Sequence, residues 1–398
     1  MKSAKVIIVG AGPVGTFVAY CLAEYGIETT LLESEASCET DMRASTFHPS
    51  TLKYLDNLNL ANELIEKGLK APIFQYRIRA TDEILEFNLE ELSDVLDFPF
   101  RLQCEQYKFA RMLADKLDNH NCSSVMFNRK LISFSDTGNK VKLKVDHKGV
   151  EEDYECDYLI GADGANSIVR RNLGIEFGGF TYKEKFFTLS TEKPLENYFK
   201  ELSYVNYVSD PDEWFVMLKA PSAWRILVPV DEELDDDVIT SDDYVKNIFK
   251  RALNSDDCIE TIHRTIYRVH QRVVDTMRSG RVILAGDSAH LNNPLGGFGM
   301  NGGIHDAWNL AKQLDEIINH NKDEDLLDLY DRQRRTIMND FIQKQTIRNK
   351  KMIEETGNDR YSSEWNRMRN IHQNHIKRRE YMFRQTMSES LLREAEIS

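Results

Sequence analysis

The apolar and polar positions of this chain follow two different periods, which predicts a mixed α/β fold. The chain opens with a strand at Lys5–Val9, a helical spacing of apolar residues from Phe17 that Gly26 ends, and a second strand at Glu28–Leu32 that ends on Glu33. This order is typical of a compact βαβ unit.

The same two periods continue to the end of the chain. They predict, in order, a helix over 50–68, strands within 72–102, a helix over 106–117, a strand pair within 125–145, a buried strand at 158–161, an aromatic strand-rich stretch over 180–275, and helices from about 302 onward. The acidic run over 231–243 interrupts the strands as a solvated loop or a helix start.

Composition narrows the class of protein. With 398 residues, 41% of them hydrophobic, the chain can form two packed domains or one elaborated domain. The formal net charge of −14 argues against nonspecific nucleic-acid binding. The cysteines lack CxxC spacing, so we expect no metal site and a reducing compartment, the cytoplasm. The first apolar run, Val6–Val9, is too short for a signal segment or a membrane span.

A glycine-rich turn joins the first strand to the first helix, with the sequence Gly10-Ala11-Gly12-Pro13-Val14-Gly15. Glycines at these positions permit a tight turn, a close approach of a pyrophosphate, and close packing of helix on strand. Glu33 stands 18 residues after Gly15, where an acid can bind a ribose. The turn therefore predicts a dinucleotide site.

Two further motifs follow strands. The stretch Asp157–Arg170 carries Asp163-Gly164 at a strand end, and read alone it is an ordinary strand-to-helix turn. The stretch Arg281–Asn301 begins as a buried strand, breaks at Gly286-Asp287, passes a proline and three glycines, and enters an amphipathic helix. Its backbone N–H groups and helix N-terminus suit an anionic ligand.

In this order, the three motifs resemble those of the FAD-dependent aromatic hydroxylases, the single-component flavoprotein monooxygenases of the para-hydroxybenzoate hydroxylase type. The resemblance covers residues 4–34, 43–48, 101–117, 155–172 and 280–315. It implies hydroxylation of a phenolic or related aromatic substrate with NADH or NADPH and O2, through a flavin C4a-hydroperoxide. It also implies FAD as cofactor, a small aromatic substrate as partner, and leaves a homodimer open.

The implied fold is a Rossmann-like FAD-binding domain with an inserted β-sheet substrate domain and a helical C-terminal region. We expect the FAD-binding domain at 1–71, 103–179 and 276–320, the substrate domain at 72–102 and 180–275, and the helical region at 321–398.

The resemblance also assigns cofactor residues. The ADP half of FAD falls to Gly10, Gly12, Gly15 and Glu33, and the remaining cofactor contacts fall to Pro13, Arg43, Ala44, Gln103, Asp163, Gly164, Asp287, Gly299, Met300 and Asn301. Of these, Asp163-Gly164 matches a signature shared by FAD and the nicotinamide. The last three would line the pyrimidine edge of the flavin.

The substrate side is less specific. Pro294 and Leu295 match the loop that faces the substrate ring in the family, and Pro294 and His290 are the candidate catalytic residues. His290 and His305 either join a proton relay or simply bond to loop backbone. The candidate pocket residues are Phe215, Met217, Trp224 and Arg225, and core packing explains the first three equally well.

Two other functions fit the same motifs. One is an FAD-dependent reductase or dehydrogenase of the same fold, and the other is a non-enzymatic FAD-binding sensor. The sequence leaves open the substrate ring, the site of hydroxylation, the choice of NADH or NADPH, the oligomeric state and the groups that assist substrate deprotonation.

Overall fold

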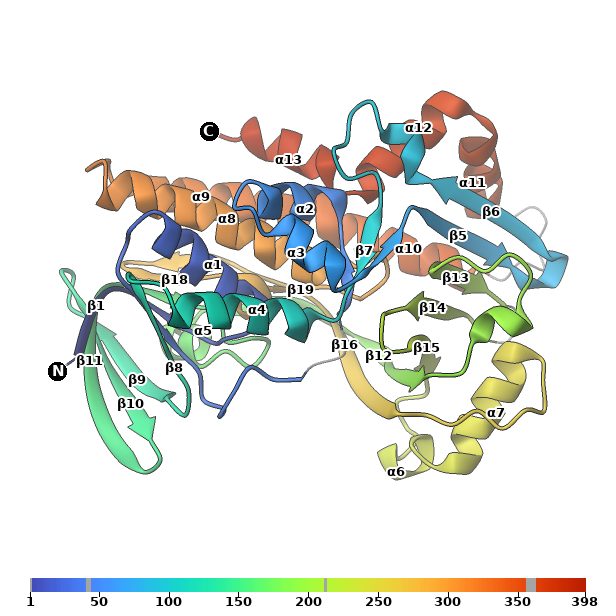
Figure 1. The fold of residues 1–398 in the computed structure, drawn as a ribbon, viewed down its shortest axis with the longest axis horizontal. Coiled ribbons are helices and arrows are strands. Elements are labelled where there is room, and N and C mark those ends of the chain that lie inside the picture. The colour runs from blue at the N-terminus through green and yellow to red at the C-terminus, as the bar shows by residue number, and fades with distance from the viewer. Residues whose placement is uncertain (1, 41–43, 211–212, 356–362) are drawn as a thin grey trace.

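The computed structural model describes residues 2–40, 44–210, 213–355 and 363–398. Two large sheets lie along the molecule, sheet A at the left of Figure 1 and sheet C at the right, with most helices above them. The predicted α/β class, with a Rossmann-like part, a further sheet and a helical C-terminal region, is confirmed.

Sheet A carries the βαβ unit. Its spatial order is β17 (Arg278–Ser279), β18 (Val282–Leu284), β11 (Val150–Gly161), β1 (Lys2–Val9), β2 (Thr29–Leu32) and β8 (Ser123–Met126), with β9 (Lys130–Asp136) and β10 (Val141–His147) joined to β11.

The parallel strands of sheet A bring the three motifs to one edge. β1 pairs with β11 in parallel, with Val9 opposite Gly161, and β11 pairs with β18 in parallel, with Gly161 opposite Leu284. Because these three residues end their strands in register, the loops after them start side by side. Ligands of open α/β sheets bind at this kind of edge.

Four helices pack beside sheet A and contribute to its buried core. They are α1 (Pro13–Glu24), α4 (Gln106–Asp118), α5 (Ile168–Leu173) and α8 (Gly299–Ile318). The buried core joins Ile7 and Leu159 of the sheet to Phe17 of α1 and Leu310 of α8.

Sheets B and C hold the remaining strands. Sheet B has the order β3 (Thr46–Phe47), β7 (Arg101–Gln103) and β4 (Leu69–Ala71). Sheet C has the order β19 (His290–Leu291), β16 (His263–Val274), β12 (Phe177–Thr191), β15 (Trp224–Val230), β14 (Phe215–Lys219), β13 (Val205–Ser209), β5 (Ile73–Ile78) and β6 (Glu83–Asn88). Short 3₁₀ turns connect several strands: η1 (Arg79–Thr81), η2 (Leu89–Leu92), η3 (Leu195–Tyr198) and η4 (Gly286–Ser288).

Two predicted elements differ from the structure. The single helix expected over 50–68 is two helices, α2 (Pro49–Asp56) and α3 (Ala61–Glu66), because the chain turns at Asn59 with φ +57°. The acidic run is helical in part: α6 (Asp236–Ile239) is followed by α7 (Asp242–Leu253), which packs against the lower face of sheet C (Figure 1).

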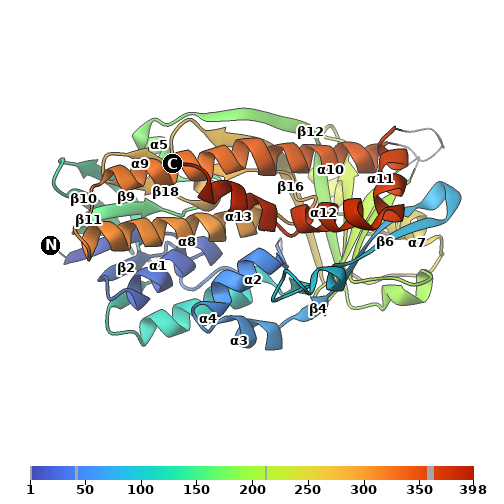
Figure 2. The same cartoon turned by 90° about the horizontal axis from the view of Figure 1, so that it is seen from above.

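One long helical line joins the two halves of the molecule, as Figure 2 shows. It consists of α9 (Asp325–Ile337), a π-helical segment η5 (Met338–Gln343) and α10 (Lys344–Glu354). The later helices α11 (Ser363–Gln373), α12 (His375–Gln385) and α13 (Ser388–Ala395) turn back along it. Among the described residues, every helix is too short or too polar to cross a bilayer.

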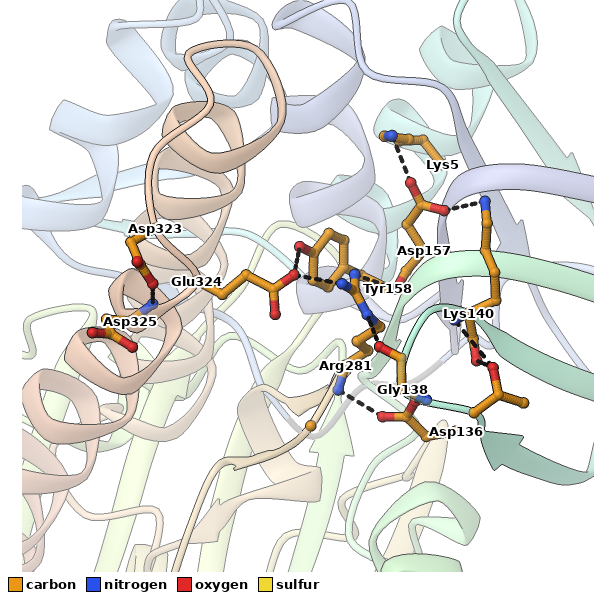
Figure 3. A network of polar contacts seen from close by, with 12 residues as sticks. Lys5, Asp136, Gly138, Lys140, Asp157, Tyr158, Arg281, Asp323, Glu324 and Asp325 are labelled. Carbon is orange, nitrogen blue, oxygen red and sulfur yellow. Dashed lines mark hydrogen bonds and ion pairs between the residues drawn. The ribbon is translucent and has the colours of Figure 1, made fainter.

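The opposite edge of sheet A is held by the polar network in Figure 3. Arg281, just before β18, pairs with Glu324 at 2.7 Å, and its backbone N–H donates to Asp136 at 2.9 Å. Lys5 and Lys140 both pair with Asp157 of β11. These contacts hold the parallel strands together at the edge opposite the three motifs. The charged side chains of this network therefore lie away from the candidate site.

Candidate functional site

The first glycine turn closes tightly onto β11. Gly10 has φ +104°, and a Cβ on it would lie 2.5 Å from the Ala162 carbonyl oxygen. A Cβ on Gly15 would lie 1.9 Å from the Gly10 carbonyl oxygen. Gly12, which precedes Pro13 at the start of α1, has no atom within 4 Å of the place of its missing Cβ. Gly12 therefore leaves room for a ligand beside the helix N-terminus.

Glu33 follows β2 and is bound to the same turn. Its Oε2 accepts a hydrogen bond from the Ala11 N–H at 2.7 Å, and its Oε1 accepts one from the Glu35 N–H at 3.0 Å. The carboxylate of Glu33 thus lies beside the glycine turn. Its contact with a ribose stays a prediction.

The second motif is joined to the third. Asp163 Oδ2 accepts a hydrogen bond from the Ile168 N–H at 2.7 Å, while Oδ1 is buried without a partner among the described residues. Burial raises the pKa of Asp163. After Gly164, which has φ +77°, Arg170 of α5 donates to the Ser288 carbonyl at 2.9 Å. The Asp-Gly turn and the Gly286–Ser288 turn therefore form one surface.

The Gly286–Ser288 turn is itself fixed to the sheet. A Cβ on Gly286, which has φ +66°, would lie 2.9 Å from a methyl group of Val14. Ser288 Oγ donates to the Gly161 carbonyl at 2.6 Å. Asp287, between them, is exposed at the motif edge.

The side chain of Asn301 holds the glycine loop together. Its Nδ2 donates to the carbonyls of Thr46 at 2.8 Å and Gly297 at 2.7 Å, and its Oδ1 accepts from the His48 N–H at 2.9 Å and the Thr51 hydroxyl at 2.7 Å. The amide is thus fully engaged by protein groups. If Asn301 contacts a ligand as predicted, its backbone N–H is the group available.

The start of α8 offers such N–H groups. The helix begins at Gly299 and Met300 after Phe298, without a side-chain cap. The N–H groups of a first helical turn have no intrahelical acceptor, and they carry the positive end of the helix dipole. An anionic ligand edge fits at this point.

A cluster of buried charges lies beneath the loop. Asp306 accepts from His290 Nε2 at 2.6 Å, from Arg334 Nε at 2.7 Å and from the Gly286 N–H at 2.9 Å. Arg334 also pairs with Glu394 of α13. His290 is 1% exposed, so the structure places this candidate catalytic residue inside the protein, on a carboxylate rather than on loop backbone. Its catalytic role stays a prediction.

His305 is also buried, next to hydroxyl groups. Its Nε2 lies 3.1 Å from Thr51 Oγ1 and 3.4 Å from Ser50 Oγ. Burial, assisted by the positive charge of Arg334, lowers the pKa of His305 to about 3. His305 is therefore neutral at physiological pH, which suits a hydrogen-bonded core histidine better than a group that titrates during turnover.

This shift predicts acid sensitivity. The folded-state pKa of His305 lies below the unfolded value of about 6.5, so its contribution to stability is complete above that pH and is lost as the pH falls toward 3. Between pH 6.5 and 4.5, we expect the free energy of unfolding of the wild type to fall by about 2–3 kcal/mol more than that of His305→Gln. Urea unfolding at several pH values measures the difference. His320→Gln, which replaces an exposed histidine, is the control substitution. An unchanged slope in His305→Gln would contradict the prediction.

Two buried polar atoms in or beside sheet B have no hydrogen-bond partner among the described residues. Thr46 Oγ1 donates to Gln103 Oε1 at 3.1 Å, but Gln103 Nε2 and Ser45 Oγ have no hydrogen-bond partner in the described part of the chain. Ala44, beside them, is half-buried, and Arg43 lies outside the described residues. Because unsatisfied buried polar groups are costly, this cradle fits a polar ligand that reaches from the glycine turns to sheet B.

Leu295 links the glycine loop to sheet C. It is 2% exposed, while the neighbouring Pro294 is half-buried. Leu295 belongs to the apolar cluster between sheet C and helices α10–α12, on what we call the inner face of the sheet. Aromatic side chains of this cluster include Phe74, Tyr76, Phe87, Phe186, Tyr207 and Trp214.

Three of the predicted pocket residues lie on the other face. Phe215, Met217 and Trp224 share a cluster with residues of α7, and Leu295 is not in it. Side chains alternate along a strand, so Trp214 and Val216 point inward where Phe215 and Met217 point outward. For these three, the structure favours the core-packing alternative.

Arg225 lies on the inner side of β15, between outward-facing Trp224 and Ile226, and is 2% exposed. Two other residues of this region, His48 and Arg101, were not among the predicted site residues. His48 Nε2 donates to the Gly296 carbonyl at 2.8 Å, and Arg101 stands two residues before Gln103 on β7. Period-two alternation could have identified Arg101, since it shares a strand face with Gln103.

Comparison with known proteins points to one family. The family described as FAD binding domain matches residues 3–345. The 6-hydroxy-3-succinoylpyridine 3-monooxygenase HspB of Pseudomonas putida (strain DSM 28022 / S16) is 32% identical over 83% of this chain and 84% of its own length. The para-nitrophenol 4-monooxygenase of Pseudomonas sp. (strain WBC-3) is 29% identical over 89% of this chain and 92% of its own.

Solved structures agree with this. The crystal structure of p-nitrophenol 4-monooxygenase PnpA from Pseudomonas putida DLL-E4 superposes with a TM-score of 0.91 and 26% identity, over 97% of this chain and 99% of that one. The similarity thus extends over both sheets and the C-terminal helices.

Proposed function

The chain belongs to the FAD binding domain family and is an FAD-dependent aromatic monooxygenase, and we propose that it uses NAD(P)H and O2 to hydroxylate a small phenolic ring. The loop over 294–301 is the observation that supports this assignment best. It joins the uncapped N-terminus of α8 to the aromatic inner face of sheet C through Leu295. A cofactor edge and an aromatic ring can therefore meet at this loop.

The cradle on the motif edge fits FAD. The room beside Gly12, the buried Asp163 Oδ1 and the unpartnered Gln103 Nε2 suit a long ligand with polar groups along its length. We assign FAD to Gly10, Gly12, Pro13, Gly15, Glu33, Ala44, Gln103, Asp163, Gly164, Asp287, Gly299, Met300 and Asn301, together with Arg43. When bound, FAD supplies the redox chemistry, with electrons from NAD(P)H and one oxygen atom of O2 going to the ring.

The protein residues have three tasks in this scheme. The N-terminus of α8 stabilises negative charge on a bound ligand by about 1 kcal/mol, and by more where water is excluded. The aromatic inner face and Leu295 exclude water and orient a ring. Pro294, half-buried on the same loop, would face that ring.

The relatives reported above are monooxygenases, which favours oxygen transfer over the reductase and sensor alternatives. We also propose the domain division given above, with 72–102 and 180–275 as the substrate domain, and a cytoplasmic location. The described cysteines support that location because they form no disulfide. The homodimer stays a prediction.

Reconstituted protein tests the proposal. After FAD loading, phenol, 4-nitrophenol and 4-hydroxybenzoate are supplied in turn with NADH or NADPH under ¹⁸O₂. We expect at least one ring to accelerate NAD(P)H oxidation and to gain one ¹⁸O atom. Turnover of a ring without label in the product would favour the dehydrogenase instead, and bound FAD without turnover of any aromatic compound would favour the sensor.

A further inference from the structure

Arg101 lies next to the proposed flavin cradle. β3 and β7 pair with Thr46 opposite Gln103 and Phe47 opposite Leu102. One step along this register brings His48 opposite Arg101. Because strand side chains alternate, Arg101 lies on the same side of sheet B as Gln103, two residues away along β7.

The guanidinium of Arg101 is buried among aromatic groups. The residue is 1% exposed, and its Cζ lies 4.3 Å from the centre of the Phe74 ring. Nη1 donates to the Tyr207 hydroxyl over a long 3.4 Å, and Nε has no partner among the described residues. Phe74 and Tyr207 belong to the inner face, so the side chain reaches from sheet B into the substrate side.

Two other buried arginines of the described chain, Arg334 and Arg77, have strong polar partners. Arg334 is bound by Asp306 and Glu394, and Arg77 donates to the Lys200 carbonyl and to Gln75 Oε1, both at 2.7 Å. Around Arg101, no carboxylate of the described residues is within ion-pair distance. A buried cation without an anionic partner is costly, and the contacts with Phe74 and Tyr207 offset only part of that cost, so an anionic ligand would stabilise Arg101 further.

The neighbours of Arg101 indicate that an anionic ligand would lie beside the glycine loop. His48 Nε2 donates to the Gly296 carbonyl, which leaves Nδ1 as a buried acceptor without a partner. Burial and the charge of Arg101 lower the pKa of His48, so the ring is neutral. Leu295, next to Gly296, shares the inner-face cluster with Phe74 and Tyr207. An aromatic ligand here meets apolar walls, one cation and one neutral acceptor.

We propose that Arg101 binds an anionic oxygen group on the substrate ring and thereby makes the enzyme selective for anionic aromatic substrates. This inference rests on the proposed function, because it places the ring of that substrate between the loop and the inner face. The anionic oxygen belongs either to a phenolate or to a carboxylate substituent.

Equilibrium binding to the oxidised, FAD-loaded protein tests this without turnover. Calorimetric titration compares benzoate with benzamide, which has nearly the same shape but no charge. We expect the wild type to prefer benzoate, and Arg101→Met to bind benzoate about 30-fold more weakly while its affinity for benzamide changes less than about 3-fold. Arg101→Lys keeps the charge and should retain part of the preference.

Arg77→Met is the matched control, since it removes a buried arginine that contacts Phe199 on the outer face of sheet C. It should keep the wild-type ratio of the two affinities. Equal losses for benzoate and benzamide in Arg101→Met, or no preference in the wild type, would overturn the proposal. If Arg101→Met does not fold, the ratio of benzoate to benzamide affinity in Arg101→Lys decides. The lysine contacts the anion over a longer distance, so this ratio should fall below that of the wild type, and an unchanged ratio would overturn the proposal.

The two sources of the anion are separated with 4-nitrophenolate and 4-nitroanisole, in which the same oxygen is charged in the first and methylated in the second. Loss of discrimination between these two in Arg101→Met assigns the arginine to the phenolate oxygen. Loss confined to benzoate assigns it to the ring substituent. Charge-selective binding without ¹⁸O incorporation into any phenol would refute the proposed function and leave the role of Arg101 in place.

Discussion

Gly15→Ala is expected to yield a protein that is less stable and that retains no FAD. The added Cβ would lie 1.9 Å from the Gly10 carbonyl oxygen, a backbone atom that cannot move without opening the turn onto β11. Overpacking of this kind costs about 1–3 kcal/mol. Because the displaced turn is also the predicted pyrophosphate site, the purified variant should be colourless.

Gly12→Ala separates the fold from the cofactor. A Cβ there meets no atom within 4 Å, and its φ of −73° suits any residue. The FAD-free variant should therefore melt at the wild-type temperature, while its affinity for FAD falls by at least about tenfold, equal to 1.4 kcal/mol. Thermal melting with and without FAD, together with fluorescence titration of FAD, measures both effects. Wild-type FAD affinity in Gly12→Ala would show that the cofactor does not approach this turn.

Local signals made the three motifs predictable. Each motif ends a buried strand with glycine, and parallel pairing carries Val9, Gly161 and Leu284 to one edge in register. Such an arrangement follows from general rules for α/β sheets, so the fold class could be expected from the sequence.

The inner face of sheet C could not be identified in the same way. Strand β14 is buried on both sides at its start, so Phe215 and Val216 are both apolar although they face different clusters. Alternation shows that neighbouring side chains face opposite sides, but it does not show which side is the inner one. The positions of α7 and of helices α10–α12 decide this. The same reasoning applies to Trp224 and Arg225.

Polar contacts between residues far apart in the sequence could not be predicted from local patterns either. Asn301 was expected to face a ligand, but its amide binds Thr46, Gly297, His48 and Thr51. The sequence separation between Asn301 and His48 exceeds any periodicity. The break between α2 and α3 at Asn59 is different, because the apolar spacing continues through it and hides the turn.

Asp306→Asn is expected to destabilise the protein by about 3–5 kcal/mol and to loosen the Gly286–Ser288 turn. The carboxylate is fully buried and accepts from His290, Arg334 and the Gly286 N–H. An amide offers one acceptor oxygen where these donors use two, and it leaves Glu394 as the carboxylate paired with Arg334. Because Gly286 begins the turn that bears Asp287, FAD affinity should fall together with stability.

The pH dependence distinguishes this loss of charge from a loss of packing. Burial alone would raise the pKa of Asp306, but the attraction of His290 and Arg334 and their hydrogen bonds outweigh it and hold the pKa below its usual range. With the folded pKa below the unfolded value of about 3.9, the stability from Asp306 is complete above that pH and is lost as the pH falls through the folded pKa. The difference in unfolding free energy between wild type and Asp306→Asn should therefore be constant near neutral pH and shrink in strong acid.

Asp340→Asn is the control, because Asp340 pairs with Lys344 at the surface and both side chains are more than half exposed. Exposed pairs of this kind add little to stability, so this variant should melt with the wild type. Urea unfolding from neutral to acid pH measures all three proteins. If Asp306→Asn lost no more stability than Asp340→Asn, the buried charges would not be what holds the third motif against α8, and the turn would have to be fixed by Ser288 and Arg170 instead.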